Sequence, residues 1–182
     1  MKALKVGVLT KDFRIYNRLM CLLKNIGQPF VSLRESDRYS SFDLVLTDMD
    51  LSGGNVYKTD GLDEFRIRQL VKSGDSHEIV VGIDPGPMPG IATLANNIVI
   101  DRRSIYDVRE IRNYVLRVNN ECSHKDLIVK IGDGDRRYRN QIIRSLYGFH
   151  LQIVDEKGSS RTSKRGDDSR SAVNIALSDH IL

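Results

Sequence analysis

The 182-residue sequence has no tryptophan, only four prolines and two cysteines, and none of its apolar runs approaches the length needed to cross a bilayer, roughly 20 residues. Its first thirteen residues hold a short apolar stretch before charges resume, which is typical of a strand and not of a signal peptide. We therefore expect a cytoplasmic protein with no membrane partner.

The two cysteines, Cys21 and Cys122, lie far apart, each within a helical pattern. Neither belongs to a CxxC pair or to a cluster of cysteine and histidine, so their spacing argues against a zinc site. We expect both to be free thiols that are buried or half-buried, since free cysteine is among the most buried residue types.

The charge balance permits a polyanionic partner without requiring one. The net charge is +4, and residues 79–182, with 16 Lys and Arg against 13 Asp and Glu, account for +3 of it. Such a mixture suits a site that needs acids for metal ions and bases for phosphates, and it is also common on solvated surfaces.

Residues 1–75 are predicted to form a small α/β domain, because short apolar runs alternate with helical spacing. The polar run at 72–77 breaks this pattern and indicates a domain boundary. The strands are expected at 4–9, 29–33 and 42–47, the helices at 12–26 and 62–71, and a loop at 51–60. Asp48, after the third strand, invites comparison with phosphoacceptor receiver domains, but the acidic pair that these need is replaced by Thr10-Lys11-Asp12, so we expect no receiver function.

Residues 76–182 are predicted to form a second α/β domain, a mixed five-stranded sheet in the order βββαβαβα. Asn96-Asn97 suits a tight turn, since asparagine tolerates positive φ, and Ser104 is expected to cap the first helix. The strands are expected at 79–84, 90–95, 98–100, 127–131 and 151–154, and the helices at 105–118, 136–147 and 169–180.

Acidic residues recur where these strands and the last helix open onto one edge of the sheet. If the first, fourth and fifth strands are parallel neighbours, their carboxyl ends converge, and crowded carboxylates either raise a pKa or recruit a cation. Two Mg²⁺ ions about 4 Å apart can hold the attacking water and the leaving oxygen of a phosphodiester. The acids are Asp84 after the first strand, Asp133 and Asp135 after the fourth, Asp155 and Glu156 after the fifth, and Asp167 and Asp168 before the last helix.

Simpler interpretations exist for most of these acids. Asp135 and Asp168 stand where helices are capped, and Asp133 and Asp155 suit turns. Asp84 is harder to explain this way, because it follows the apolar residues of a core strand. A buried unpaired carboxylate is costly, so Asp84 should have a partner.

Two motifs resemble those of known nucleases. Residues 81–86 (VGIDPG) resemble the first-strand motif of bacterial Holliday-junction resolvases, which belong to the ribonuclease H-like superfamily. Residues 154–157 (VDEK) followed by 168–173 (DSRSAV) resemble the last strand and helix of their relatives in ribosomal-RNA maturation. The βββαβαβα order is that of the superfamily, and the resemblance covers residues 78–182.

The resemblance implies a set of metal ligands. Asp84 matches the aspartate that bridges the metal ions, Glu156 the glutamate after the fifth strand, and Asp168 the aspartate that opens the last helix. Resolvases have a glutamate after the fourth strand, for which Asp133 or Asp135 would have to substitute. We favour Asp133, because glycines on both sides let its backbone bend and Asp135 stands directly before a helix.

Basic residues surround these acids and are candidates for phosphate contacts, which give salt-dependent and largely sequence-independent binding. For the helical residues a solvated mixed-charge face is an equal alternative, whereas the last loop joins two expected ligands. The candidates are Arg136, Arg137, Arg139 and Arg144 on the helix after the fourth strand and Lys157, Arg161, Lys164 and Arg165 in the last loop.

The leading hypothesis is therefore a nuclease that hydrolyses phosphodiesters of a structured nucleic acid with Mg²⁺ or Mn²⁺, using two ions. One alternative is a non-catalytic nucleic-acid-binding module of the same fold, favoured by the unusual acids after the fourth strand. Another is a nucleotide-binding protein of the actin-like group, whose first strand also ends in Asp-x-Gly but which needs a second such domain. A homodimer is expected by analogy with the resolvases, since a four-way junction has two symmetric cuts.

Overall fold

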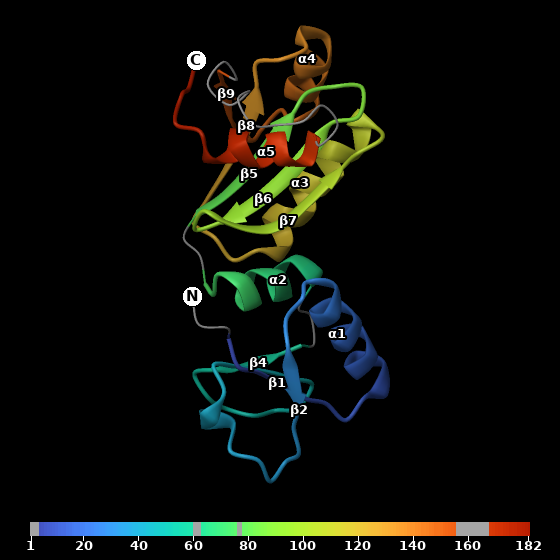
Figure 1. Ribbon diagram of the computed structural model, residues 1–182, viewed down its shortest axis with the longest axis vertical. Helices are drawn as coiled ribbons and strands as arrows, with labels where there is room; N and C mark the ends of the chain where they lie inside the picture. Colours follow the sequence, from blue (N-terminus) through green and yellow to red (C-terminus); the bar gives the residue numbers. More distant parts are fainter. Residues whose placement is uncertain (1–3, 60–62, 76–77, 156–167) are drawn as a thin grey trace. The chain divides into compact units, whose positions relative to one another are not determined.

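The computed structural model describes residues 4–59, 63–75, 78–155 and 168–182, with Asp168 described by its backbone alone. The chain divides into two compact units, Met1–Val71 and Lys72–Leu182, each with its own sheet (Figure 1). The fold is therefore of the mixed α/β class. Within the described residues no helix has both the length and the apolar character needed to span a membrane.

The first unit contains a parallel four-stranded sheet in the order β2-β1-β3-β4. Apolar side chains of β1 and β3 form one core with those of both helices, among them Val8, Leu23 and Ile67. Its elements are β1 (Val6–Leu9), α1 (Phe13–Asn25), β2 (Phe30–Ser32), a short 3-10 turn (Tyr39–Ser41), β3 (Leu44–Thr47), β4 (Val56–Lys58) and α2 (Glu64–Lys72).

Two expectations for this unit are wrong. The segment 51–60, expected to be a loop, contains β4, which pairs in parallel with β3 and places Val56 opposite Val45. Its glycines and asparagine have the composition of a turn, and the strand forms because the edge of β3 offers a partner. Cys21 is exposed, since the buried face of α1 is made by Leu19 and its neighbours, whereas Cys122 is buried as expected.

Asp48, directly after β3, fixes the loop between β1 and α1. Its carboxylate accepts hydrogen bonds from the backbone N–H of Lys11, at 3.0 Å to each oxygen, and from that of Asp12 at 2.8 Å. Asp12 in turn caps α1 by accepting from the Arg14 N–H at 2.7 Å. The carboxylate that invites comparison with receiver domains therefore has a structural role in this unit.

The second unit is built around a five-stranded sheet in the order β7-β6-β5-β8-β9. The first three strands form an antiparallel meander, with positive φ at Asn96 and Asn97 as expected for this pair, and β8 and β9 add in parallel. The elements follow as β5 (Glu78–Asp84), β6 (Gly90–Ala95), β7 (Ile98–Ser104), α3 (Val108–Glu121), β8 (Asp126–Gly132), α4 (Arg136–Ser145), β9 (His150–Val154) and α5 (Asp168–Leu177).

The start of α3 differs from the expectation. β7 continues to Ser104, beyond the expected end at Ile100, and α3 begins only at Val108. The prediction that Ser104 caps a helix from residue 105 is therefore wrong. The cap is Asp107, whose carboxylate accepts the backbone N–H of Arg109 at 2.9 Å.

Helices cover both faces of this sheet. α5 packs on the face that carries Val80, Ala92 and Leu94. Thr93 lies on the other face by strand alternation, and its hydroxyl is hydrogen-bonded to Tyr114 of α3. α4 packs beside α3. The second unit thus has three layers, with α5 on one side of the sheet and α3 and α4 on the other.

α5 approaches the sheet most closely at Gly82 of β5. A Cβ at this position would lie 2.8 Å from that of Ala176 and would collide with the carbonyl oxygen of Ala172, so only glycine leaves room. Lys130, opposite Gly82 on β8, is buried and donates to the Ser178 carbonyl oxygen at 2.7 Å, just beyond the end of α5. A cation at this helix end is favourable, and the two contacts together set the position of α5.

We expect Gly82→Ala to lower the free energy of unfolding by about 1–3 kcal/mol, the usual cost of overpacking, because α5 must move away from the sheet. Gly86→Ala is the matched control, since a Cβ there meets nothing within 4 Å and should change stability by less than about 0.5 kcal/mol. Urea unfolding of the full chain measures both. Equal stabilities of the two variants would contradict the close contact at Gly82.

Candidate functional site

Acidic residues end three neighbouring parallel strands of the second unit. Asp84 is the last residue of β5, and Asp133 and Asp155 directly follow β8 and β9. Ile83 pairs with Ile131 and Ile131 with Ile153, so the three strands end at nearly the same level. The expected convergence of these strand ends on one edge of the sheet is confirmed.

The strand register assigns these acids to different faces. Val80 and Gly82 contact α5, so strand alternation places Asp84 on the α5 face as well. Asp133 lies one step beyond the Gly132–Val154 pair, and its N–H donates to the Val154 carbonyl at 2.9 Å, which continues the ladder. The same alternation then directs Asp133 toward the face of α3 and α4, where the chain bends into α4.

Asp135 caps α4, as the sequence indicates. Its carboxylate oxygen accepts the backbone N–H groups of Arg137 at 2.8 Å and Tyr138 at 3.3 Å. The Asp133 carbonyl oxygen accepts from Arg139 Nη1 at 3.1 Å, which holds the bend between β8 and α4. The carboxylate of Asp135 therefore has a structural partner, and both Asp84 and Asp133 are half-buried at the edge of the sheet.

The first residue of α5 is Asp168, a predicted ligand of which the backbone alone is described. Residue 168 opens the helix and lies in the same i, i+4 row as Ala172 and Ala176, the two residues that contact Gly82. This row is the side of α5 that covers β5, the strand that ends in Asp84. Glu156, Lys157, Arg161, Lys164 and Arg165 lie outside the described residues.

The donor set fits a hard divalent cation in chemistry. Asp84, Asp133, Glu156 and Asp168 offer only carboxylate oxygens, which Mg²⁺ and Mn²⁺ accept together with water. Within the described part of the chain, no three side chains of His, Cys, Asp or Glu lie close enough to hold a metal ion. Since only Asp84 and Asp133 of the predicted set have described side chains, the set as a whole stays a prediction.

The expected basic residues on α4 are accessible. Arg136 and Arg137 are exposed on its first turn, directly after the capping Asp135, and neither forms an ion pair with a described acid. Arg144 is exposed on the last turn of the helix. Exposed guanidinium groups without acidic partners are suited to phosphate contacts.

Sequence reasoning missed a hollow between the start of α3 and the outer side of α4. Its volume is about 500 Å³, and we name it the Tyr106 hollow. The only sequence signal for it is Tyr106, a large aromatic in the loop between β7 and α3, which is 84% exposed. The residues that line it include Pro87, Tyr106, Asp107, Arg109, Tyr138, Gln141 and Arg144.

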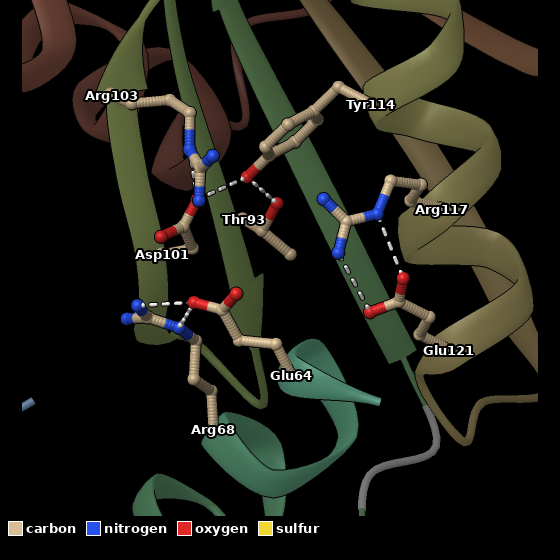
Figure 2. A network of polar contacts seen from close by, with 8 residues as sticks. All are labelled: Glu64, Arg68, Thr93, Asp101, Arg103, Tyr114, Arg117 and Glu121. Atoms are coloured by element: carbon tan, nitrogen blue, oxygen red, sulfur yellow. Dashed lines mark hydrogen bonds and ion pairs between the residues drawn. The ribbon is translucent and has the colours of Figure 1, made fainter. Parts of the chain in front are cut away.

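A buried polar network fixes α3 against β6 and β7 (Figure 2). The Tyr114 hydroxyl donates to Asp101 Oδ2 at 2.9 Å and lies 2.8 Å from the Thr93 hydroxyl, which donates to it. Arg103 Nε donates to the same Asp101 oxygen at 2.8 Å. Burial, and then the negative charge of Asp101, raise the pKa of the Tyr114 hydroxyl well above its usual value, so the hydroxyl stays protonated.

Comparison with known proteins identifies no family for this chain. No family model and no curated protein matches it. Among solved structures, the chain is similar to the X-ray crystal structure of Marinitoga piezophila Argonaute in complex with 5′ OH guide RNA and target DNA, at 10% sequence identity and a TM-score of 0.30. The match covers 84% of this chain and 39% of the Argonaute chain, so this chain spans about two fifths of that protein. A likeness of this size supports no statement about function.

The two acids after β8 should respond differently to mutation. We expect Asp135→Ala to lower the free energy of unfolding by about 1 kcal/mol, the usual loss of a helix cap, because two backbone N–H groups lose their acceptor. Asp133→Ala keeps both backbone hydrogen bonds of residue 133 and should cost less. Urea unfolding of the two variants compares them, and a larger loss for Asp133→Ala would show that its carboxylate supports the fold.

Tyr114→Phe should reduce stability by about 1–2 kcal/mol at pH 8, because Asp101 and Thr93 each lose a buried hydrogen-bond partner. In the unfolded chain tyrosine titrates near pH 10, and in the fold its pKa is higher. The stability that the Tyr114 hydroxyl contributes is therefore fully present below pH 10 and is lost as the pH rises toward the folded pKa.

The difference between wild type and Tyr114→Phe should then shrink above pH 10 by up to about 1.4 kcal/mol per pH unit. Urea unfolding between pH 8 and pH 11 measures this slope. Tyr106→Phe is the control for the loss of an exposed tyrosine hydroxyl, and it should leave the stability at pH 8 unchanged. A pH-independent difference for Tyr114→Phe would exclude a raised pKa.

Proposed function

We propose that residues 72–182 form a ribonuclease H-like, metal-dependent nuclease domain that hydrolyses phosphodiesters of a structured nucleic acid. The observation that carries the proposal is the place of Asp84 at the end of the central strand β5, next to the ends of the parallel strands β8 and β9. The βββαβαβα succession of elements and the two motifs at residues 81–86 and 154–173 support it.

Asp84, Glu156 and Asp168, with Asp133 as the fourth candidate, would hold one or two Mg²⁺ or Mn²⁺ ions. When bound, such ions supply positive charge that activates water and stabilises the leaving 3′ oxygen. Asp84 is half-buried at the end of β5, so part of this residue is exposed to water. The close contact of α5 with Gly82 supports a role for Asp168, because Ala172, one turn after residue 168 on α5, contacts β5 two residues before Asp84.

The basic residues would position the nucleic acid on this edge. Arg136 and Arg137 stand exposed at the start of α4, which directly follows the end of β8. Lys157, Arg161, Lys164 and Arg165 lie in the sequence between the Glu156 and Asp168 candidates. Together they would contact phosphates on either side of the scissile bond, and a homodimer would present two such edges.

A non-catalytic nucleic-acid-binding module is the second candidate. One observation favours it: the register directs Asp133 toward the face opposite Asp84, so the acid after β8 is less suited to complete the ligand set. Such a protein would keep the phosphate contacts of the arginines without cleaving. Measuring binding and cleavage on the same substrates separates the two candidates.

We expect Asp84→Asn to lower divalent-metal-dependent cleavage by about a hundredfold or more, because the amide keeps the shape of the side chain but loses the charge that holds cations. The fold should stay intact, because asparagine has nearly the same size and shape as aspartate. The assay follows labelled branched DNA, structured RNA and single strands with Mg²⁺, Mn²⁺ or EDTA.

Asp126→Asn is the matched control, because Asp126 is an exposed residue at the opposite end of β8. This variant should cleave the substrates at the wild-type rate. Cleavage by Asp84→Asn at the wild-type rate would mean that the assigned site is wrong. Wild-type binding without cleavage of any of these substrates would favour the non-catalytic module.

A further inference from the structure

The Tyr106 hollow has the composition of a nucleotide-binding subsite. Tyr106 and Tyr138 offer aromatic surfaces, on which bases stack, and the Gln141 amide carries both a donor and an acceptor for the edge of a base. Its volume of about 500 Å³ lies in the range of pockets that hold small ligands. The hollow is therefore large enough and mixed enough in chemistry for one nucleotide.

The charge of the hollow favours an anion. Arg109 is already paired, because its guanidinium donates to the Asp107 carboxylate at 2.6–3.1 Å. Arg144 is exposed and forms no hydrogen bond or ion pair with any described residue, so its charge is available to a ligand. Arg136 and Arg137, on the first turn of the same helix, add to the positive charge of this side.

The walls of the hollow are held rigidly. Arg112 of α3 donates through Nη1 to the carbonyl oxygens of Ser145 at 2.7 Å and Tyr147 at 3.2 Å, which fastens α3 to the end of α4. The network of Tyr114 with Thr93 and Asp101 fastens the same helix to the sheet. A pocket between two anchored helices needs little ordering when a ligand binds, which favours affinity.

One wall of the hollow belongs to the loop that begins after Asp84. Pro87, in its wall, follows Asp84 by three residues in the loop between β5 and β6. The Ile105 N–H donates to the Pro89 carbonyl at 2.8 Å, which holds the segment with Tyr106 against this loop. Asp84 pairs with Gly90, and Gly90 pairs with Ser104, so Asp84 and the start of the Tyr106 segment lie at the same level of the sheet.

We propose that the Tyr106 hollow binds an unpaired nucleotide next to the scissile phosphate, so that the substrate class is nucleic acid with a single-stranded or unstacked segment. The base stacks on Tyr106 and Tyr138, and Arg144 pairs with the adjacent phosphate. A base within a duplex cannot do this, because both of its faces are covered by neighbouring bases. The position next to the scissile phosphate rests on the proposed nuclease function, whereas binding of the unpaired nucleotide needs no cleavage.

Fluorescence anisotropy of the full chain in EDTA tests the binding apart from cleavage. The probes are a labelled single-stranded oligonucleotide and the duplex of the same sequence. We expect Tyr106→Ala to weaken single-strand binding by about five- to a hundredfold and to leave duplex binding within about twofold, as the loss of one stacked base implies. Tyr147→Ala is the matched control, since Tyr147 is equally exposed but lies outside the hollow, and should change neither affinity.

Arg144→Ala should weaken single-strand binding and reduce the slope of log affinity against log salt by about 0.7, the value of one phosphate contact on a single strand. Lys125→Ala removes a charge at the other end of the sheet and should leave the slope unchanged. Both tyrosines and both cations are exposed, and matching thermal melts confirm that the variants are folded.

The proposal is overturned if wild type shows no single-strand binding, if Tyr106→Ala and Tyr147→Ala behave alike, or if single-strand and duplex binding weaken together. Its failure is distinct from failure of the nuclease function, because binding is measured in EDTA, where metal-dependent cleavage does not take place. If Tyr106→Ala does not weaken single-strand binding while Asp84-dependent cleavage is observed, the subsite proposal fails and the nuclease function stands. A Tyr106 effect without cleavage would support the subsite in a non-catalytic module.

Discussion

The missing side chain at Gly82 sets the distance between α5 and the sheet of the second unit. Ala172 and Ala176 contact the backbone of β5 there, so the helix lies as close as two small residues allow. Two residues further along β5 is Asp84, and one turn before Ala172 on α5 is Asp168. The position of the start of α5 relative to the end of β5 therefore depends on a contact between a glycine and two alanines, and Lys130 supports this position at the other end of the helix.

The two faces of this sheet have different tasks. The α5 face is small and apolar around Gly82 and leads to the carboxylate of Asp84. The other face carries α3 and α4, whose outer surfaces hold the Tyr106 hollow and the exposed arginines. Its buried network joins Thr93, Asp101 and Tyr114 on three elements, so the helix that forms one wall of the hollow cannot shift without breaking hydrogen bonds inside the unit.

Local sequence patterns predicted the strands and helix caps that depend on residues close together in the chain. Apolar runs located the strands that end in Asp84 and before Asp133, and the capping role of Asp135 followed from its place before a helix. The continuation of β7 could not be predicted, because a charged Asp101 in a strand becomes favourable only with Tyr114 and Arg103 beside it. Partners that lie far apart in the chain leave no short-range pattern.

The candidate site also has parts that the sequence predicts and parts that it does not. The edge on which the acids converge could be predicted from the motif that ends in Asp84 and from the strand order it implies. The face on which Asp133 lies depends on the register with β9, and the Tyr106 hollow depends on how α3 packs beside α4. Neither can be seen until the strands and helices are placed.

The most direct measurement of the central claim is the anomalous diffraction of crystals soaked in MnCl₂, which locates bound manganese without reference to any reaction. The expected result is a manganese peak coordinated by the Asp84 carboxylate, with Glu156 and Asp168 among its other ligands. Manganese bound only elsewhere on the chain, or no peak beside Asp84 at millimolar concentration, would contradict the assignment of this edge as a metal-dependent nuclease site.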